Sequence, residues 1–119
     1  MGPLCRIRDL YRSIAEFEIR FQEQYGFCLN SGMLLCSLKE KISLSSGEIA
    51  HLLGITYSNA SKTIKVVEDK GLINRKLGMR DKRQMYFSLT EKGEELLEDM
   101  AKNMVELPTE LKAYMSQFE

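Results

Sequence analysis

A short helix bounded by two local signals constrains the fold of this chain more than any other feature. Ser45 and Glu48 have the spacing of a capping box, in which each side chain bonds the other residue's backbone N–H. Gly54 supplies the left-handed conformation that closes a helix at low steric cost. Only about two turns of helix fit between these signals, so the sequence predicts a short helix that ends at Gly54.

A second helix is predicted directly after the first. Thr56 or Ser58 can cap it, and Gly71 closes it. Its apolar residues fall on one face at spacings of 4 and 3, at Ala60, Ile64 and Val67. Two short helices joined by a tight turn are the signature of a helix-turn-helix, whose second helix enters the major groove of DNA.

The opposite face of this second helix is polar and basic. Hydroxyl and amide groups can bond base edges or phosphates, and lysines supply the positive charge that phosphate contact needs. The candidate DNA-binding residues on this face are Ser58, Asn59, Ser61, Lys62 and Lys65. An ordinary solvent-exposed face is the alternative, which these residue types alone do not exclude.

Two strand-like segments enclose a basic tip after the second helix. Residues 72–76 and 84–89 flank a segment containing Gly78, which predicts a two-stranded hairpin. Because an isolated hairpin is marginal in water, it must rest on the helices through residues such as Ile73, Met85 and Phe87. A basic ribbon tip can enter the narrow minor groove. The candidate DNA-binding residues here are Arg75, Arg80, Lys82 and Arg83.

Charge is distributed unevenly along the chain, although 17 basic residues balance 17 acidic ones. Residues 1–54 hold six of each. Residues 55–83 hold eight basic against three acidic side chains, a net charge of +5, whereas residues 84–119 hold three against eight, a net charge of −5. Such local asymmetry is typical of a surface that meets polyphosphate.

Apolar stripes near both ends of the chain predict further helices. Before Gly26 the stripe consists of Ile7, Leu10, Ile14, Phe17 and Phe21. Thr90 caps a predicted long helix with Leu96, Leu97, Met100, Met104 and Leu107 on its apolar side, which Pro108 ends. Leu111, Met115 and Phe118 mark a short last helix. Residues 33–42 are apolar almost all round, which predicts a buried core helix that includes Cys36.

The terminal stripes present more apolar surface than one small core can cover, which indicates a homodimer. The candidate dimerisation residues are Ile7, Leu10, Ile14, Phe17, Met104, Leu107, Leu111 and Met115. Packing of the two stripes on each other within one subunit is the alternative.

Composition limits the other classes of protein. A chain of 119 residues with 44% hydrophobic and 29% charged residues is expected to fold as one globular domain. We expect no membrane span and no signal peptide, hence a cytoplasmic protein. Three cysteines without C-x-x-C spacing and a single His51 predict neither a disulfide framework nor a metal site. Nucleophile and phosphate-loop motifs are absent from the sequence, so we expect no enzyme and no cofactor.

Residues 29 to 100 resemble the MarR family of bacterial winged-helix transcription regulators. The resemblance rests on E-I-A-H-L-L-G-I at 48–55, S-N-A-S-K at 58–62, E-D-K-G-L-I-N-R at 68–75, and R-D-K-R-Q at 80–84 leading to S-L-T-E-K-G at 88–93. It implies that residues 58–70 form the recognition helix, and that Asp81 orients Arg83 in the wing. It also implies a homodimer, interlocked by its terminal helices, that represses transcription from a pseudo-palindromic operator in double-stranded DNA.

The predicted fold is mainly α with a small two-stranded β-hairpin wing, a winged helix-turn-helix within one structural domain. Residues 1–28 form an N-terminal dimerisation helix, residues 29–90 the DNA-binding core, and residues 91–119 the C-terminal dimerisation helices. A small-molecule effector or an oxidant is a candidate regulator, since one branch of the family senses oxidants through a cysteine near the position of Cys5. The alternative function is a winged-helix protein-interaction module that does not bind DNA.

Overall fold

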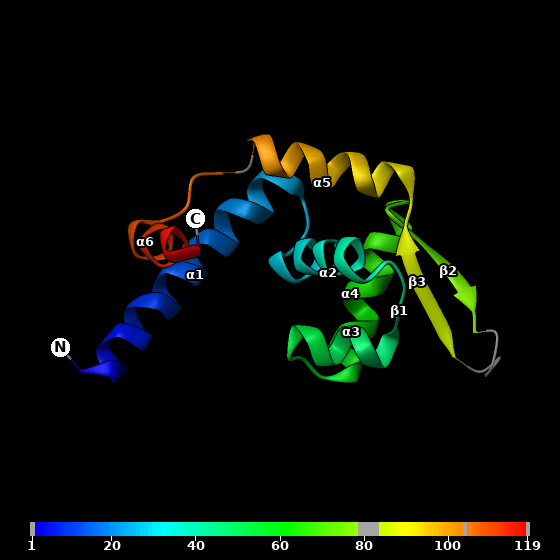
Figure 1. Cartoon of the computed structure of the whole chain (residues 1–119), viewed down its shortest axis with the longest axis horizontal. Coiled ribbons are helices and arrows are strands. Elements are labelled where there is room, and N and C mark those ends of the chain that lie inside the picture. The colour runs from blue at the N-terminus through cyan, green and yellow to red at the C-terminus, as the bar shows by residue number, and fades with distance from the viewer. Residues whose placement is uncertain (1, 79–83, 104, 119) are drawn as a thin grey trace. The chain divides into compact units, whose positions relative to one another are not determined.

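The computed structural model describes residues 2–78, 84–103 and 105–118 (Figure 1). The chain forms two compact units, one made of Met1–Cys28 with Met104–Glu119 and the other of Leu29–Asn103. The predictions for Arg80, Asp81, Lys82, Arg83 and Met104 lie outside the described residues.

The unit Leu29–Asn103 contains the helix-turn-helix and its wing. Its elements are α2 (Leu29–Lys41), β1 (Leu44–Ser45), α3 (Ser46–Leu53), α4 (Tyr57–Asp69), β2 (Ile73–Leu77), β3 (Met85–Leu89) and α5 (Glu91–Asn103). Helix α2 lies between α5 and the α3–α4 pair (Figure 1). The predicted mainly helical winged fold is therefore confirmed.

Local signals set the ends of α3 as predicted. The Ser45 N–H donates to Glu48 Oε1 at 2.9 Å, and the Glu48 N–H donates to Ser45 Oγ at 3.2 Å, which completes the capping box. Gly54 closes the helix at φ 67°. A Cβ is disfavoured in this left-handed region, so glycine is the residue that ends the helix here without strain.

Of the two predicted N-caps of helix α4, Thr56 and Ser58, the structure uses Thr56. The Asn59 N–H donates to Thr56 Oγ1 at 3.1 Å, so Thr56 rather than Ser58 is the N-cap. The predicted apolar stripe of Ala60, Ile64 and Val67 is buried. This burial leaves the polar stripe of α4 on the outside of the unit.

The sheet has one strand more than predicted. Strands β2 and β3 pair antiparallel over Ile73↔Leu89 to Leu77↔Met85, as expected for a hairpin. The additional strand β1 pairs with the other side of β3, giving the order β1-β3-β2. A strand of two residues is too short to show a period of two, so the sequence pattern could not reveal it. Phe87 in the central strand is 2% exposed.

Helix α2 is buried on one side only, which corrects the prediction of a helix buried almost all round. Leu34, Leu35 and Leu38 are at most 1% exposed. Met33 is 40% exposed and Cys36 is also exposed, because α3, α4, α5 and β3 pack around the rest of the helix and leave this stripe uncovered. Ile42 follows the helix at φ 69° and is 77% exposed.

The start of α5 is tied to the end of α4. Thr90 Oγ1 accepts from the Gly93 N–H at 3.0 Å and donates to the Gly71 carbonyl at 2.7 Å, which confirms Thr90 as the cap. Lys92 Nζ donates to the Lys70 carbonyl at 2.9 Å. A Cβ on Gly93 would collide with the Leu72 carbonyl oxygen, so the backbones meet here at a distance that only glycine permits.

Helix α5 is shorter than the predicted helix, which the sequence extended to Pro108. It ends at Asn103, and residues 105–108 are outside any helix, Leu107 among them. The contacts of α5 are with α2 and β3 inside the unit Leu29–Asn103.

The other unit consists of α1 (Pro3–Tyr25), α6 (Thr109–Met115) and the short 3-10 helix η1 (Ser116–Phe118). Helix α1 ends at Gly26, as predicted, with φ 76°. A cluster of aromatic rings fills the core of this unit. It is formed by Phe17, Phe21, Tyr25 and Phe27.

Polar contacts join α1 to the start of α6. Ser13, which is buried, donates to Glu110 Oε2 at 3.0 Å, and Arg12 lies 3.4 Å from Glu110 Oε1. A backbone hydrogen bond at Glu110, the Ser13 hydroxyl and the Arg12 guanidinium lower the pKa of the Glu110 carboxyl. The ionised carboxylate therefore favours the folded unit.

Replacing Gly93 tests the close approach between α5 and Leu72. Gly93→Ala should destabilise the protein by about 2 kcal/mol, because overpacking against a backbone carbonyl forces one segment to move. Thermal or urea unfolding monitored by circular dichroism measures the change. Gly47→Ala is the matched control, since a Cβ there meets nothing within 4 Å. Equal stability of the two variants would contradict the packing described.

The Glu110 carboxylate predicts a pH dependence of stability. Because its folded pKa is lowered, its contribution is present above the ordinary carboxyl pKa and is lost as pH falls through the folded value. Thermal unfolding should therefore separate wild type from Glu110→Gln near pH 7, with the gap closing in acid. Glu16→Gln on the exposed surface of α1 is the control, and should follow the wild type throughout. A gap that is constant with pH would contradict this role.

Candidate nucleic-acid interface

All five residues predicted on the polar face of α4 are exposed in the structure. They are Ser58, Asn59, Ser61, Lys62 and Lys65. They lie on a helix whose opposite side is anchored by the buried Ala60, Ile64 and Val67. The face therefore offers hydroxyl, amide and ammonium groups from a rigid element, the chemistry that contacts with bases and phosphates require.

Both lysines of this face, Lys62 and Lys65, are exposed, and Lys65 is in an exposed ion pair. Lys65 Nζ lies 3.5 Å from Asp69 Oδ2, in a pair whose side chains are 75% and 63% exposed. Such an exposed pair contributes little to stability and is screened by salt. Lys65 can therefore exchange Asp69 for a phosphate at small cost.

A cleft of about 420 Å³ lies beside this face, between α3, α4 and the sheet. Its polar lining includes Ser46 and Gly47 of α3, Tyr57 and Ser61 of α4, and Arg75 and Gln84 of the hairpin. Of the residues predicted to bind DNA, the cleft thus brings Ser61 and Arg75 together.

The sequence did not single out Ser46, Gly47, Tyr57 and Gln84 as site residues. Ser46 and Gly47 belong to the first turn of α3, between the two residues of the capping box, so the sequence pattern assigned them a role in starting the helix and none in a site. Tyr57 is 63% exposed although it is a large aromatic residue, and this is visible only in the structure. The sequence offered one signal for Tyr57 as a site residue, namely that an aromatic residue directly follows the Thr56 cap.

Arg75 is held more firmly than the lysines. Its Nε donates to Glu68 Oε2 at 2.9 Å and its Nη2 donates to Glu68 Oε1 at 2.8 Å. Its Cζ also lies 5.5 Å from the centroid of the Phe87 ring. The guanidinium therefore links the last turns of α4 to the sheet, at the wall of the cleft.

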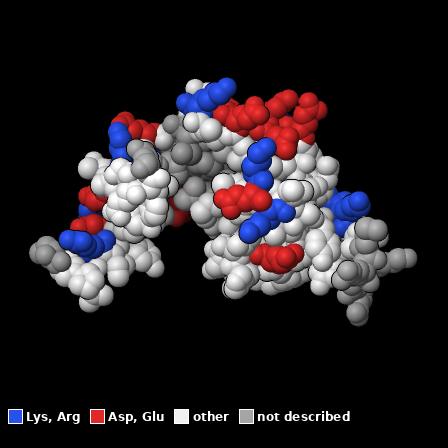
Figure 2. Space-filling model, viewed as in Figure 1, with Lys and Arg blue, Asp and Glu red and all other residues white. Residues whose placement is uncertain are grey.

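Charge differs between the two sides of the unit Leu29–Asn103. Helix α5 carries five acidic side chains and two lysines, and acidic residues gather over it on the face shown in Figure 2. Lysines and arginines outnumber acids five to two between Tyr57 and Leu77, which includes α4 and β2. A polyanion is therefore attracted to α4 and the hairpin and repelled by α5.

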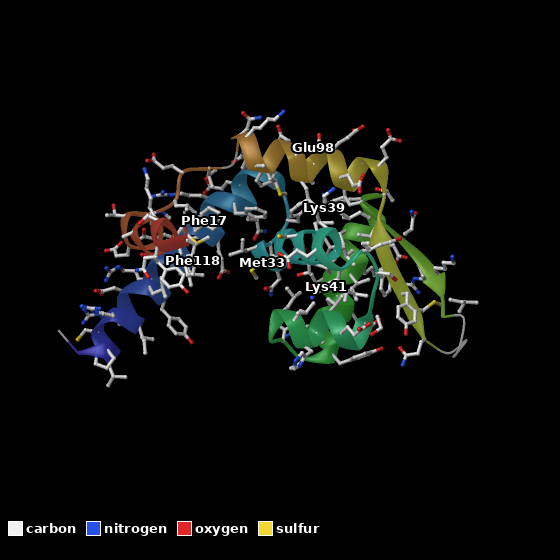
Figure 3. The ribbon with its side chains drawn as sticks, viewed as in Figure 1. Phe17, Met33, Lys39, Lys41, Glu98 and Phe118 are labelled. Atoms are coloured by element: carbon white, nitrogen blue, oxygen red, sulfur yellow. The ribbon has the colours of Figure 1, made fainter. Side chains whose placement is uncertain are left out.

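An exposed ion pair lies between α2 and the acidic helix α5. Lys39 leaves α2 on the side of α5, and its Nζ lies 3.8 Å from Glu94 Oε1 (Figure 3). Glu98, farther along α5, is exposed (Figure 3).

Other chemistry has little support in the described part of the chain. Within residues 2–78, 84–103 and 105–118, no cluster of His, Cys, Asp or Glu has the arrangement of a metal site. No helix among them has the length and hydropathy needed to cross a membrane. Cys5 is partly exposed, and Cys28 and Cys36 are exposed. The redox role of Cys5 stays a prediction.

Comparison with protein families gives a match that covers α2 to β2 and ends at Met85, the first residue of β3. The MarR family model matches residues 29–85. An HTH-type transcriptional regulator of Bacillus subtilis, YwaE, is 28% identical over 115 residues, which span 93% of this chain and 67% of YwaE. The regulator PetP of Rhodobacter capsulatus is 25% identical over 70% of this chain and 50% of its own length. The chain thus spans half to two thirds of these relatives.

Solved structures with the same fold include proteins captured in DNA-binding states. Staphylococcus aureus MepR in its DNA-binding conformation has a TM-score of 0.78 at 20% identity, over 99% of this chain and 82% of MepR. YusO of Bacillus subtilis has a TM-score of 0.67 at 26% identity, over 94% of this chain and 74% of YusO. The family match, the relatives and the fold agree with the resemblance that the sequence motifs indicated. Residues 29–85 of this chain match the MarR family of winged helix-turn-helix transcriptional regulators, and the chain has the fold of solved structures such as MepR.

Proposed function

We propose that this protein regulates transcription by binding double-stranded DNA, with α4 in the major groove and the hairpin at the flanking backbone. The observation that carries the proposal is the division of α4 into a buried apolar stripe and an exposed polar, basic stripe. The anchored stripe fixes the orientation of the helix, and the exposed stripe presents Asn59, Ser61 and Lys62 for contact. Structures of MepR and of AbfR bound to DNA share this fold.

The hairpin is proposed to supply a second set of contacts. Arg75 lies at the wall of the cleft, and Arg80, Lys82 and Arg83 are the predicted basic residues of the tip, with Asp81 as the residue that orients Arg83. Cations on a narrow ribbon are attracted by the negative potential of the minor groove.

We propose that the DNA-binding form is a homodimer that represses transcription from a pseudo-palindromic operator. Support comes from the unit formed by α1 and α6, where apolar side chains remain exposed although the two helices pack together. They include Leu4 at 80%, Ile7 at 50%, Tyr11 at 74%, Met115 at 47% and Phe118 at 71% exposure. A second copy would cover this surface. Two recognition helices would then address successive major grooves, about 34 to 36 Å apart.

Regulation of this dimer is proposed to act by population shift. A small molecule or an oxidant changes DNA affinity only if it stabilises one conformation of the dimer over the other. The structure of BpsR concerns regulation of its DNA binding by 6-hydroxynicotinic acid, and AbfR was solved in reduced and overoxidised forms with DNA. For this chain Cys5 is the candidate for oxidation, and the cytoplasm is the proposed location.

Salt-dependent binding tests the proposed interface. Fluorescence anisotropy with a labelled duplex from upstream of the protein's own gene should show binding that weakens with salt. In Lys62→Ala the affinity should fall on every sequence, and the salt slope should decrease by about one, because one phosphate contact is lost. Lys102→Ala on α5 is the matched control and should leave the slope unchanged. Equal salt slopes for wild type and Lys62→Ala would show that Lys62 is not part of the interface. Binding to acidic polypeptides but not to DNA would favour the alternative function, a winged-helix protein-interaction module.

Sedimentation tests the proposed dimer. Ile7→Ser should shift the protein toward the monomer and weaken operator binding, because it places a hydroxyl in the exposed N-terminal part of the apolar stripe of α1. Ile19→Ser is the matched control, since Ile19 is 63% exposed on the same helix but outside that stripe. Similar sedimentation of the two variants would contradict the proposed interface.

A further inference from the structure

We infer that Glu68 is a positioning residue for DNA binding, which holds the Arg75 guanidinium at the wall of the cleft for contact with a backbone phosphate. The inference rests on the proposed function and adds a role for an acidic residue that neither the charge pattern nor the motifs assigned to the interface. A carboxylate on a surface that meets phosphates should by itself weaken binding, so the position of Glu68 beside Arg75 requires another physical reason.

The geometry of the pair is that of a fixed fork. Arg75 Nε and Nη2 donate to the two oxygens of Glu68 at 2.9 and 2.8 Å. Bidentate pairs of this kind constrain orientation as well as distance. The side chain of Glu68 is 27% exposed, compared with 63% for its neighbour Asp69 in the looser pair with Lys65. Of these two acids, therefore, only Glu68 has the geometry of a clamp.

The Phe87 ring completes the clamp from a second element. Phe87 is 2% exposed and lies on the central strand, where it is paired with Leu44 on one side and Arg75 on the other. Arg75 Cζ lies 5.5 Å from the ring centroid, within the range of a cation–π contact. Arg75 is thus oriented by a carboxylate from α4 and by an aromatic ring from the sheet.

Arg75 keeps the capacity to bind a phosphate while it is clamped. A guanidinium has five N–H donors, and the pair with Glu68 uses two of its nitrogens. The Arg75 side chain is still 47% exposed, and it lines the same cleft as Tyr57 and Ser61 of α4. A side chain that is already ordered loses less conformational entropy when it binds. The position suits a phosphate of the strand that α4 contacts.

Glu68→Gln compared with Asp69→Asn separates positioning from electrostatics. Each variant removes one negative charge, at adjacent positions near the end of α4. If only charge mattered, both variants would bind operator DNA more tightly than the wild type. We expect Glu68→Gln to bind about fivefold more weakly, because the fork loses its ionic partner. Asp69→Asn should bind as tightly as the wild type or more tightly, because Lys65 is released for phosphate.

A double-mutant cycle with Arg75→Ala shows whether Glu68 acts through Arg75. Arg75→Ala should weaken binding and lower the salt slope by about one, which a merely structural role would not do. In the Arg75→Ala background, Glu68→Gln should no longer weaken binding. Thermal unfolding of each variant verifies that the fold is retained.

The outcomes distinguish the inference from the proposed function. Suppose that the wild type binds DNA. If Glu68→Gln then binds as tightly as Asp69→Asn, or if Arg75→Ala leaves the salt slope unchanged, the inference is overturned and the proposed function stays intact. If the wild type shows no salt-dependent binding to operator DNA or to other duplexes, both the inference and the proposed function fail.

Discussion

The burial of one stripe of α4 is the constraint on which the rest of the DNA-binding unit depends. Ala60, Ile64 and Val67 are at most 3% exposed, against a core to which α2 contributes three leucines. Because a helix with one face anchored has no rotational freedom left, the position of every exposed residue on α4 follows from this packing. Burial of about three aliphatic side chains outweighs the small contributions that exposed ion pairs make at the same helix.

The hairpin and α5 depend on a second feature, the junction near Leu72. Here the Thr90 side chain bonds the Gly71 carbonyl, the Thr90 N–H bonds the Leu72 carbonyl, and Gly93 permits close approach. The junction fixes the direction in which β2 leaves α4 and in which α5 leaves β3. Together with the Glu68–Arg75 pair, it connects the described strands β2 and β3 to the end of α4. Such connections hold the parts of a site in a fixed arrangement.

The two units of the chain differ in the kind of surface that each exposes to solvent. The unit Leu29–Asn103 contains most of the buried hydrophobic residues that the structure describes, and it presents charge outside, positive near α4 and negative on α5. The unit of α1 and α6 has an aromatic core, yet it leaves isoleucine, leucine and aromatic side chains exposed. Apolar surface left in this way is typical of an element that completes its packing with a partner.

The sequence by itself determined the ends and faces of most helices, because caps, closing glycines and helical periodicity act over a few neighbouring residues. Ser45, Thr56, Gly26 and Gly54 all act as local chemistry predicts. Tertiary structure alone decided which residues meet across elements. It added β1 to the sheet, uncovered Cys36 on α2, ended α5 before Leu107, and joined Glu68 to Arg75 and Phe87. These outcomes depend on packing between different secondary-structure elements, which leaves no periodic signal in the sequence from which to predict them.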